Sequence, residues 1–188
     1  MRYILRTCKG REAQADYVKR CLPSVEVCFD NVGSAMNNFV KSLEMAGDDP
    51  VINLEDDIIL TKDFEIKANA VINKRPKEVI QFFSMRKSDL TIGSRHDRGA
   101  NYLMAQCTYF PEKLCKGILA YARKYENYDH KSQPLDSMVA DYLKDTKQKY
   151  WIHCPSLVDH RVGVSMIDSR RAKTNRQSFT FVDGIDES

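Results

Sequence analysis

The stretch that most constrains this chain is Val51 to Leu60, VINLEDDIIL, in which three consecutive carboxylates interrupt an apolar segment. Apolar residues on both flanks favour burial, whereas an isolated carboxylate resists burial strongly unless its charge is compensated. We therefore expect a buried strand whose carboxyl-terminal end delivers Glu55, Asp56 and Asp57 to a cleft, where a hard divalent cation neutralises them. The alternative is a strand that ends in a solvated acidic turn, because charged residues mostly face water.

The overall composition favours one globular domain with a core of its own, at 188 residues. The formal net charge is only +3, which is compatible with an anionic substrate and makes a non-catalytic nucleic-acid-binding module the least favoured class. No apolar run reaches the roughly 18 residues that a membrane span needs, and the N-terminus does not show the pattern of a signal peptide. We therefore expect a cytoplasmic protein.

The six cysteines form no C-x-x-C pair and have mostly apolar neighbours. This pattern favours reduced thiols in the core over a disulfide framework or a zinc site. The cysteines in question are Cys8, Cys21, Cys28, Cys107, Cys115 and Cys154.

Strand and helix patterns alternate through the first half of the chain. β-rich apolar runs predict strands at 3–5, 25–29 and 79–83, and the acidic strand lies within 51–60. Apolar stripes at helical spacing predict helices over 12–22, 34–46 and 63–75. This alternation is typical of parallel βαβ units, in which ligands gather at the carboxyl ends of the strands. Three polar features lie at those ends: the turn over 6–11, Asp30 and the three acids.

The second half has a different rhythm. Residues 84–100 are polar and predict a loop or flap at the active site, and 101–110 predict a strand. Helices are predicted after Pro111 and from Leu135, and strands at 150–154 and 178–182.

This order of motifs resembles the nucleotide-sugar glycosyltransferases of the GT-A fold, over the chain from Arg2 to about Ser178. The three acids are similar to the Asp-x-Asp motif of that family. The segment PLDSM, with Asp136, falls where the family places its acidic catalytic motif, and PSLVDH, ending in His160, resembles its late segment with a metal-binding histidine.

The resemblance implies an α/β fold of the GT-A (Rossmann-like) type, with a mixed, mostly parallel central sheet flanked by helices. It also implies a single glycosyltransferase domain over 1–188. Residues 1–83 would form the nucleotide-sugar-binding half, and 84–188 the acceptor half and C-terminal segment.

The resemblance assigns Asp57 and His160 as ligands of Mn²⁺ or Mg²⁺. Such a metal bridges the pyrophosphate oxygens and offsets charge on the leaving nucleoside diphosphate. Glu55 takes the first place of the motif, where the family usually has aspartate facing the donor, and Asp56 takes the middle place. The alternative for His160 is an ordinary structural histidine.

Five further positions receive donor contacts or catalytic roles from the same resemblance. Thr7 and Arg11 flank the first βα turn, and Asp30 would accept from the uracil imide. Asn37 would contact the nucleotide, and Arg98 of the polar loop would reach phosphates. The alternative for the first four of these residues is a role in a turn or cap.

Asp136 takes the place of the general base that removes a proton from the acceptor hydroxyl. The alternative is a carboxylate favoured by the macrodipole in the first turn of its helix. An enzyme that retains configuration at the sugar would need no such base.

The sequence therefore predicts a metal-dependent glycosyltransferase with a nucleotide-sugar donor, expected to be a UDP-sugar. The candidate acceptors are a hydroxyl of a modified DNA base, which the basic run over 169–176 favours, and a glycan. The alternative is a Mg²⁺-dependent phosphoryl-transfer or nuclease domain. It predicts further acids from other strand ends at the same site.

Overall fold

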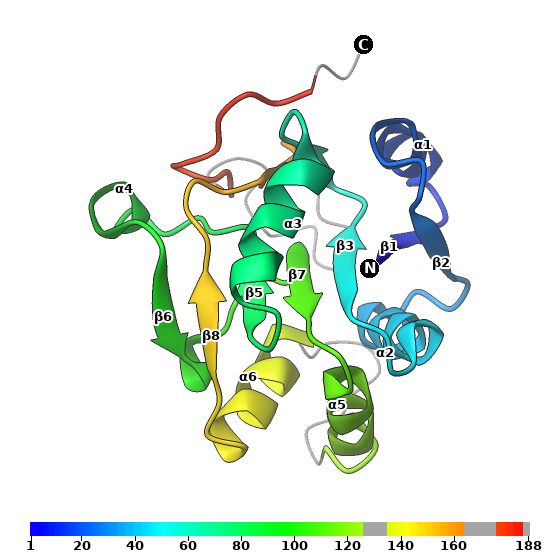
Figure 1. The fold of residues 1–188 in the computed structure, drawn as a ribbon. Helices are drawn as coiled ribbons and strands as arrows, with labels where there is room; N and C mark the ends of the chain where they lie inside the picture. Colours follow the sequence, from blue (N-terminus) through cyan, green and yellow to red (C-terminus); the bar gives the residue numbers. More distant parts are fainter. Residues whose placement is uncertain (126–134, 164–175, 186–188) are drawn as a thin grey trace.

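A mixed seven-stranded sheet forms the centre of the computed structural model, which describes residues 1–125, 135–163 and 176–185 (Figure 1). The strand order is β2-β1-β3-β7-β5-β8-β6. Strands β2, β1, β3, β5 and β8 run in one direction, whereas β7 and β6 run in the other. The predicted class, a Rossmann-like α/β fold with a mixed and mostly parallel sheet, is confirmed.

The strands of this sheet are short. In chain order they are β1 (Arg2–Cys8), β2 (Glu26–Asp30), β3 (Val51–Glu55), β5 (Val79–Gln81), β6 (Arg95–Arg98), β7 (Cys107–Phe110) and β8 (Lys149–Ile152). A separate two-stranded sheet pairs β4 (Ile58–Leu60) with β9 (Val158–His160).

Helices cover both faces of the central sheet. Side chains of α1 (Glu12–Cys21) and α3 (Phe64–Lys74) enter one buried apolar cluster. Those of α2 (Ala35–Ala46), α5 (Leu114–Ala122) and α6 (Leu135–Asp145) enter the other. A one-turn helix α4 (Asp89–Ile92) and a 3-10 turn η1 (Gly99–Asn101) complete the elements. In the described part of the chain, no helix has the length and apolarity to cross a membrane.

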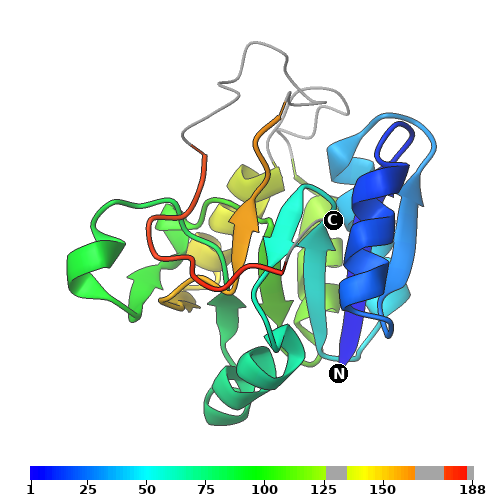
Figure 2. The same ribbon diagram turned by 90° about the horizontal axis from the view of Figure 1, so that it is seen from above.

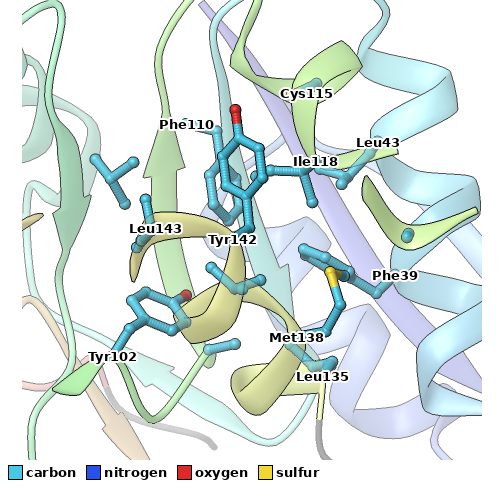
Figure 3. Packing of buried hydrophobic residues seen from close by; sticks show 14 of the residues in the cluster. Phe39, Leu43, Tyr102, Phe110, Cys115, Ile118, Leu135, Met138, Tyr142 and Leu143 are labelled. Carbon is cyan, nitrogen blue, oxygen red and sulfur yellow. The ribbon is translucent and has the colours of Figure 1, made fainter. Parts of the chain in front are cut away.

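The cluster beneath α2, α5 and α6 holds the second half of the chain against the first (Figure 3). Phe39 of α2 packs edge-on against Phe110 of β7, with ring centroids 6.0 Å apart. Met138 and Leu143 of α6 are fully buried in the same cluster. Each such side chain contributes about 1.5–3 kcal/mol on burial, so α6 and its Asp136 are held firmly over the sheet.

The first two helices predicted from local sequence patterns are confirmed. Helices α1 and α2 lie where the apolar stripes predict them, and the Ser34 hydroxyl caps α2 by accepting a bond of 3.2 Å from the Asn37 amide.

The final segment, residues 176–185, returns across the molecule to β4 and α1 (Figure 2). There the Ile185 amide donates to the Leu60 carbonyl at 2.9 Å.

The acids stand at the end of a strand, as expected, but residues 58–60 do not continue that strand. The chain bends at Asp56 and Asp57, so that β3 belongs to the central sheet while β4 leaves it to pair with β9. The bend brings Asp57 to the lining of a cleft while the apolar flanks at Leu54 and Ile58 stay buried. Strand β9 itself was not predicted.

Other boundaries also differ from the prediction. Strand β1 continues through Cys8, because it pairs with β2 and β3 on both sides, so Arg6 and Thr7 lie in a strand rather than a turn. The expected strands shorten to 107–110 and 149–152, and 178–182 form none.

Candidate active site

The acids stand at the carboxyl end of β3, beside the end of β1. The side chains of Thr7 and Asp56 are hydrogen-bonded there: the Thr7 hydroxyl donates to Oδ2 of Asp56 at 2.7 Å. Both side chains are buried. Burial raises the pKa of Asp56, and the bond from Thr7 opposes that rise. This pair closes the bend between β3 and β4.

Glu55 is paired with a buried cation. Oε1 of Glu55 lies 3.0 Å from an Nη atom of Arg6, its register partner on β1. Burial raises the pKa of Glu55 to about 7, although Arg6 lowers it. The charges of Asp57 and Asp136 raise this pKa further.

Asp57 and His160 are brought together by the small sheet. The antiparallel register of β4 and β9 pairs Ile58 with His160, and the Arg161 amide donates to the Asp57 carbonyl at 2.8 Å. Nε2 of His160 then lies 3.2 Å from Oδ2 of Asp57, in a close polar contact without hydrogen-bond geometry. Nδ1 lies 2.6 Å from the Arg161 carbonyl oxygen, which can only accept. In the neutral imidazole, Nδ1 therefore carries the proton and Nε2 presents its lone pair to Asp57.

This arrangement fits a bound cation. Among the described residues, Oδ1 of Asp57 and Nε2 of His160 are buried and have no hydrogen-bond partner. A nitrogen lone pair facing a carboxylate oxygen is unfavourable unless a proton or a metal ion lies between them. Burial acts to raise the pKa of Asp57, but the neighbouring His160 and the positive charge of Arg11 outweigh it and lower the pKa.

The protein side of such a metal site is small. In the part of the chain that the structure covers, no group of three or more His, Cys, Asp or Glu side chains could hold a metal. Asp57 and His160 would thus supply two ligands, and oxygens of a substrate and water the rest. The residues fit a metal that is completed by its substrate.

A cleft of about 510 Å³ opens in front of this pair. Arg11 of the first βα turn and Gln14 of α1 contribute to its lining, and the other wall contains residues 160–163 and Arg176. Arg11 and Arg176 both act to lower the pKa of Asp57, so their positive charges lie near it. The cleft therefore favours an anionic ligand.

Asp136 is held at the edge of the same group of acids. It lies in the first turn of α6, and its two carboxylate oxygens accept bonds from the Met104 and Ala105 amides at 3.0 and 3.1 Å. The structure thus links Asp136 to Glu55 through Ala105, whose amide donates to Asp136 and whose carbonyl accepts from Arg6, the partner of Glu55. Pro134, which precedes it in the motif, lies outside the described residues.

The predicted donor contacts divide into two groups. Arg11 lines the cleft, whereas Asp30 uses Oδ1 to accept the Val32 and Gly33 amides at 2.8 and 3.1 Å. Asn37 lies in the first turn of α2. Neither Asp30 nor Asn37 lines the cleft, although Asp30 ends β2 at the same edge of the sheet.

Arg98 is not brought to the acids. Residues 84–100 do not form the expected flap, but carry α4 and the edge strand β6, held by an ion pair of 2.7 Å between Arg95 and Asp89. Three strands separate β6 from β3 in the sheet. The pairing of Arg98 with Lys149, the first residue of β8, places it at the opposite end of the parallel strands.

Arg6 and Arg161 are the residues of this site that the sequence pattern did not single out. The signal for Arg6 was present, because a lone arginine in the apolar strand YILRTC requires a buried anion. The guanidinium of Arg161 lies over the Tyr17 ring, 4.3 Å from its centroid, and no local pattern indicates that contact. Most of the basic run, residues 169–175, lies outside the described residues.

Comparison with known proteins identifies the fold and no family. No family model matches the chain, and no curated protein matches its sequence. The crystal structure of A197 from STIV superposes with a TM-score of 0.54 over 87% of each chain, at 11% sequence identity. The likeness is one of fold.

Two further solved structures superpose less well. A putative glucose-1-phosphate thymidylyltransferase from Bacillus anthracis gives a TM-score of 0.43 at 11% identity, covering 80% of this chain and 88% of that one. An apo-UDP-glucose pyrophosphorylase gives 0.47 at 8% identity, covering 81% and 72%. Superpositions this weak say nothing specific about this chain. None of the three titles names a glycosyltransferase, so the GT-A resemblance stays a proposal.

Proposed function

We propose that this protein is a metal-dependent glycosyltransferase that takes its sugar from a nucleotide sugar, with a UDP-sugar as the donor. The observation that carries the proposal is the pair Asp57 and His160, each with an unpartnered buried atom, at the wall of a cationic cleft. Two protein ligands leave room for phosphate oxygens of a substrate at the same ion.

The metal would be held by Oδ1 of Asp57 and Nε2 of His160. When bound, it supplies positive charge that offsets the charge on the leaving nucleoside diphosphate. The imidazole ligand favours Mn²⁺ over Mg²⁺, because Mg²⁺ prefers oxygen ligands. Arg11 and Arg176 would bind the diphosphate from the two walls of the cleft.

The other acids would act on the sugar side of the reaction. Glu55 has its pKa raised by the charges of both Asp57 and Asp136. It would contact the donor, and Asp136 would take the proton of the acceptor hydroxyl.

The alternative, a two-metal nuclease or phosphoryl-transfer domain, gains no support from the described residues. It predicts several carboxylates from different strand ends holding metal ions together. Asp136 does come near Glu55, but Glu55 is paired with Arg6, Asp56 with Thr7, and Asp136 with the Met104 and Ala105 amides. We therefore favour sugar transfer, and keep a modified DNA base and a glycan as candidate acceptors.

The proposal is tested by calorimetry of UDP binding with and without Mn²⁺. Wild-type protein should bind UDP more tightly when Mn²⁺ is present, and Asp57→Asn should remove the metal-dependent part. Asp63→Asn is the matched control, since Asp63 is exposed and makes no cap bond to α3. Absence of any Mn²⁺-dependent binding, or cleavage of DNA without a sugar donor, would contradict the proposal.

The acceptor needs a separate measurement. A gel shift with double-stranded DNA at rising salt would show weakening if phosphates are contacted. No binding at low salt would leave a glycan as the acceptor.

A further inference from the structure

Arg6 is a buried cation beside the acids, bonded through Nε and one Nη atom. Its side chain is only 4% exposed. Nε donates to Oδ1 of Asn53 at 2.6 Å, and one Nη atom donates both to Glu55 and to the Ala105 carbonyl, at 3.0 and 3.1 Å. A planar guanidinium that is held at several atoms fixes the position of each partner.

The guanidinium is anchored from below by helix α2. Nδ2 of Asn53 donates to the Ser42 hydroxyl at 2.6 Å, and that hydroxyl donates to the Phe39 carbonyl at 2.6 Å. The guanidinium carbon of Arg6 also lies 5.3 Å from the centroid of the Phe39 ring. These contacts leave Arg6 no room to change its orientation.

Ala105 connects Arg6 to the candidate base. Its carbonyl accepts from Arg6, while its amide donates to Oδ1 of Asp136. The Glu55 amide in turn donates to the Gln106 carbonyl at 2.9 Å, which holds this loop against the end of β3. Glu55 and Asp136, from distant parts of the chain, are thus joined through one cation and one peptide.

We propose that Arg6 is a positioning residue for sugar transfer, which holds Glu55 and, through Ala105, Asp136 in one fixed arrangement. This inference rests on the proposed function. None of these three side chains lines the cleft that would take the diphosphate, whereas Asp57 does. Arg6 therefore governs contact with the sugar and the transfer step, and leaves nucleotide binding to the cleft.

The test compares Arg6→Lys, Glu55→Gln and the double variant with wild type. Arg2→Lys is the matched control, because Arg2 lies in the same strand and also pairs with a glutamate, Glu26, at 2.6 Å. Affinities are measured in Mn²⁺ for UDP and for UDP-glucose, UDP-galactose and UDP-N-acetylglucosamine. The sugar that wild type binds best is then used throughout.

Arg6→Lys should keep the affinity for UDP within about twofold and lower the preference for the UDP-sugar over UDP about tenfold. The double variant should lose no more of that preference than Glu55→Gln alone, because coupled residues are not additive. Arg2→Lys should change neither affinity. Donor-hydrolysis kinetics should show a lower kcat for Arg6→Lys.

Three results would overturn the role of Arg6 while leaving the proposed function standing. They are equal losses of affinity for UDP and the UDP-sugar, an unchanged preference for the UDP-sugar over UDP, and additive losses in the double variant. If wild type does not bind UDP with Mn²⁺, both proposals fail. If Arg6→Lys does not fold, Asn53→Ala takes its place, since it frees Nε of Arg6 and keeps both charges. Asn53→Ala should lower the preference for the UDP-sugar over UDP less strongly than is expected for Arg6→Lys.

Discussion

His160 reaches Asp57 because β9 pairs with β4 in an antiparallel register, which leaves Nε2 of His160 3.2 Å from Oδ2 of Asp57. The Arg161 carbonyl fixes the imidazole from its other side, at 2.6 Å from Nδ1. In the proposed metal site, a preformed pair with an oriented histidine would lose little entropy on binding the ion.

His160→Ala should weaken Mn²⁺-dependent UDP binding about tenfold or more, because a protein ligand of the metal is lost. The measurement is the shift in melting temperature caused by UDP, with Mn²⁺ and with EDTA. His96→Ala is the control, since His96 is exposed on β6 and pairs with Glu78. Retention of the full Mn²⁺-dependent shift by His160→Ala would rule out His160 as a ligand.

Glu55→Gln should stabilise the protein at alkaline pH. The pKa of Glu55 is raised from 4.5 to about 7, so the folded state binds more protons than the unfolded state between these values. The free energy of unfolding therefore falls as pH rises through that window. Glutamine still accepts from Arg6 and does not ionise.

Urea unfolding of Glu55→Gln and wild type at pH 4.5 and pH 8 checks this prediction. We expect similar stabilities at pH 4.5, and an advantage for the variant of about 1–2 kcal/mol at pH 8. A variant less stable than wild type at pH 8 would show that the ionised Glu55 is favourable beside Arg6.

His153 should make stability depend on pH in the opposite sense. Burial lowers its pKa from 6.5 to about 4, so the unfolded state binds more protons than the folded state in that window. The free energy of unfolding is therefore lost as pH falls from 6.5 to 4. His153→Phe removes this titration and keeps an aromatic ring beside Phe82, whose centroid lies 6.0 Å away.

The difference in stability between His153→Phe and wild type should grow in favour of the variant by about 2–3 kcal/mol from pH 7 to pH 4. Denaturant unfolding across this range measures it. A constant difference would mean that His153 is protonated in the folded state at pH 5.

Gly99→Ala should destabilise the contact between η1 and α6. An added Cβ would lie 2.5 Å from Cβ of Leu143 and 2.7 Å from the Gln148 carbonyl oxygen, and backbone atoms cannot give way cheaply. Overpacking of this kind costs about 1–3 kcal/mol. The free energy of unfolding from urea titration is the readout. Gly163→Ala is the control, because nothing lies within 4 Å of its added Cβ, and an equal loss in both variants would contradict the steric explanation.

Local patterns in the sequence were sufficient for the elements of the first half. The stripe of α1, the Ser34 cap of α2 and the β-rich run of β2 depend on residues within one turn or one strand. Their physical causes are helix periodicity, capping and side-chain alternation, which act over a few residues. For the same reason the three acids could be expected at the end of a strand.

The break in VINLEDDIIL was decided by tertiary structure. Whether residues 58–60 continue β3 or pair with β9 depends on a strand far along the chain, and no local pattern reports that pairing. The same holds for β6, which takes Arg98 to the distant end of the sheet because it pairs with β8. Strand pairing is non-local, so its partners are chosen by the assembled core.

In the candidate site, too, local sequence determines some features and tertiary structure decides the others. By itself, the sequence determined that Glu55, Asp56 and Asp57 follow an apolar strand and need compensation for their charge. Only the folded chain decided what each meets: Glu55 the buried Arg6, Asp56 the Thr7 hydroxyl, and Asp57 the His160 imidazole at the cleft. Adjacent carboxylates look alike in sequence, but a bend between two sheets points them at different neighbours, and the neighbours set their chemistry.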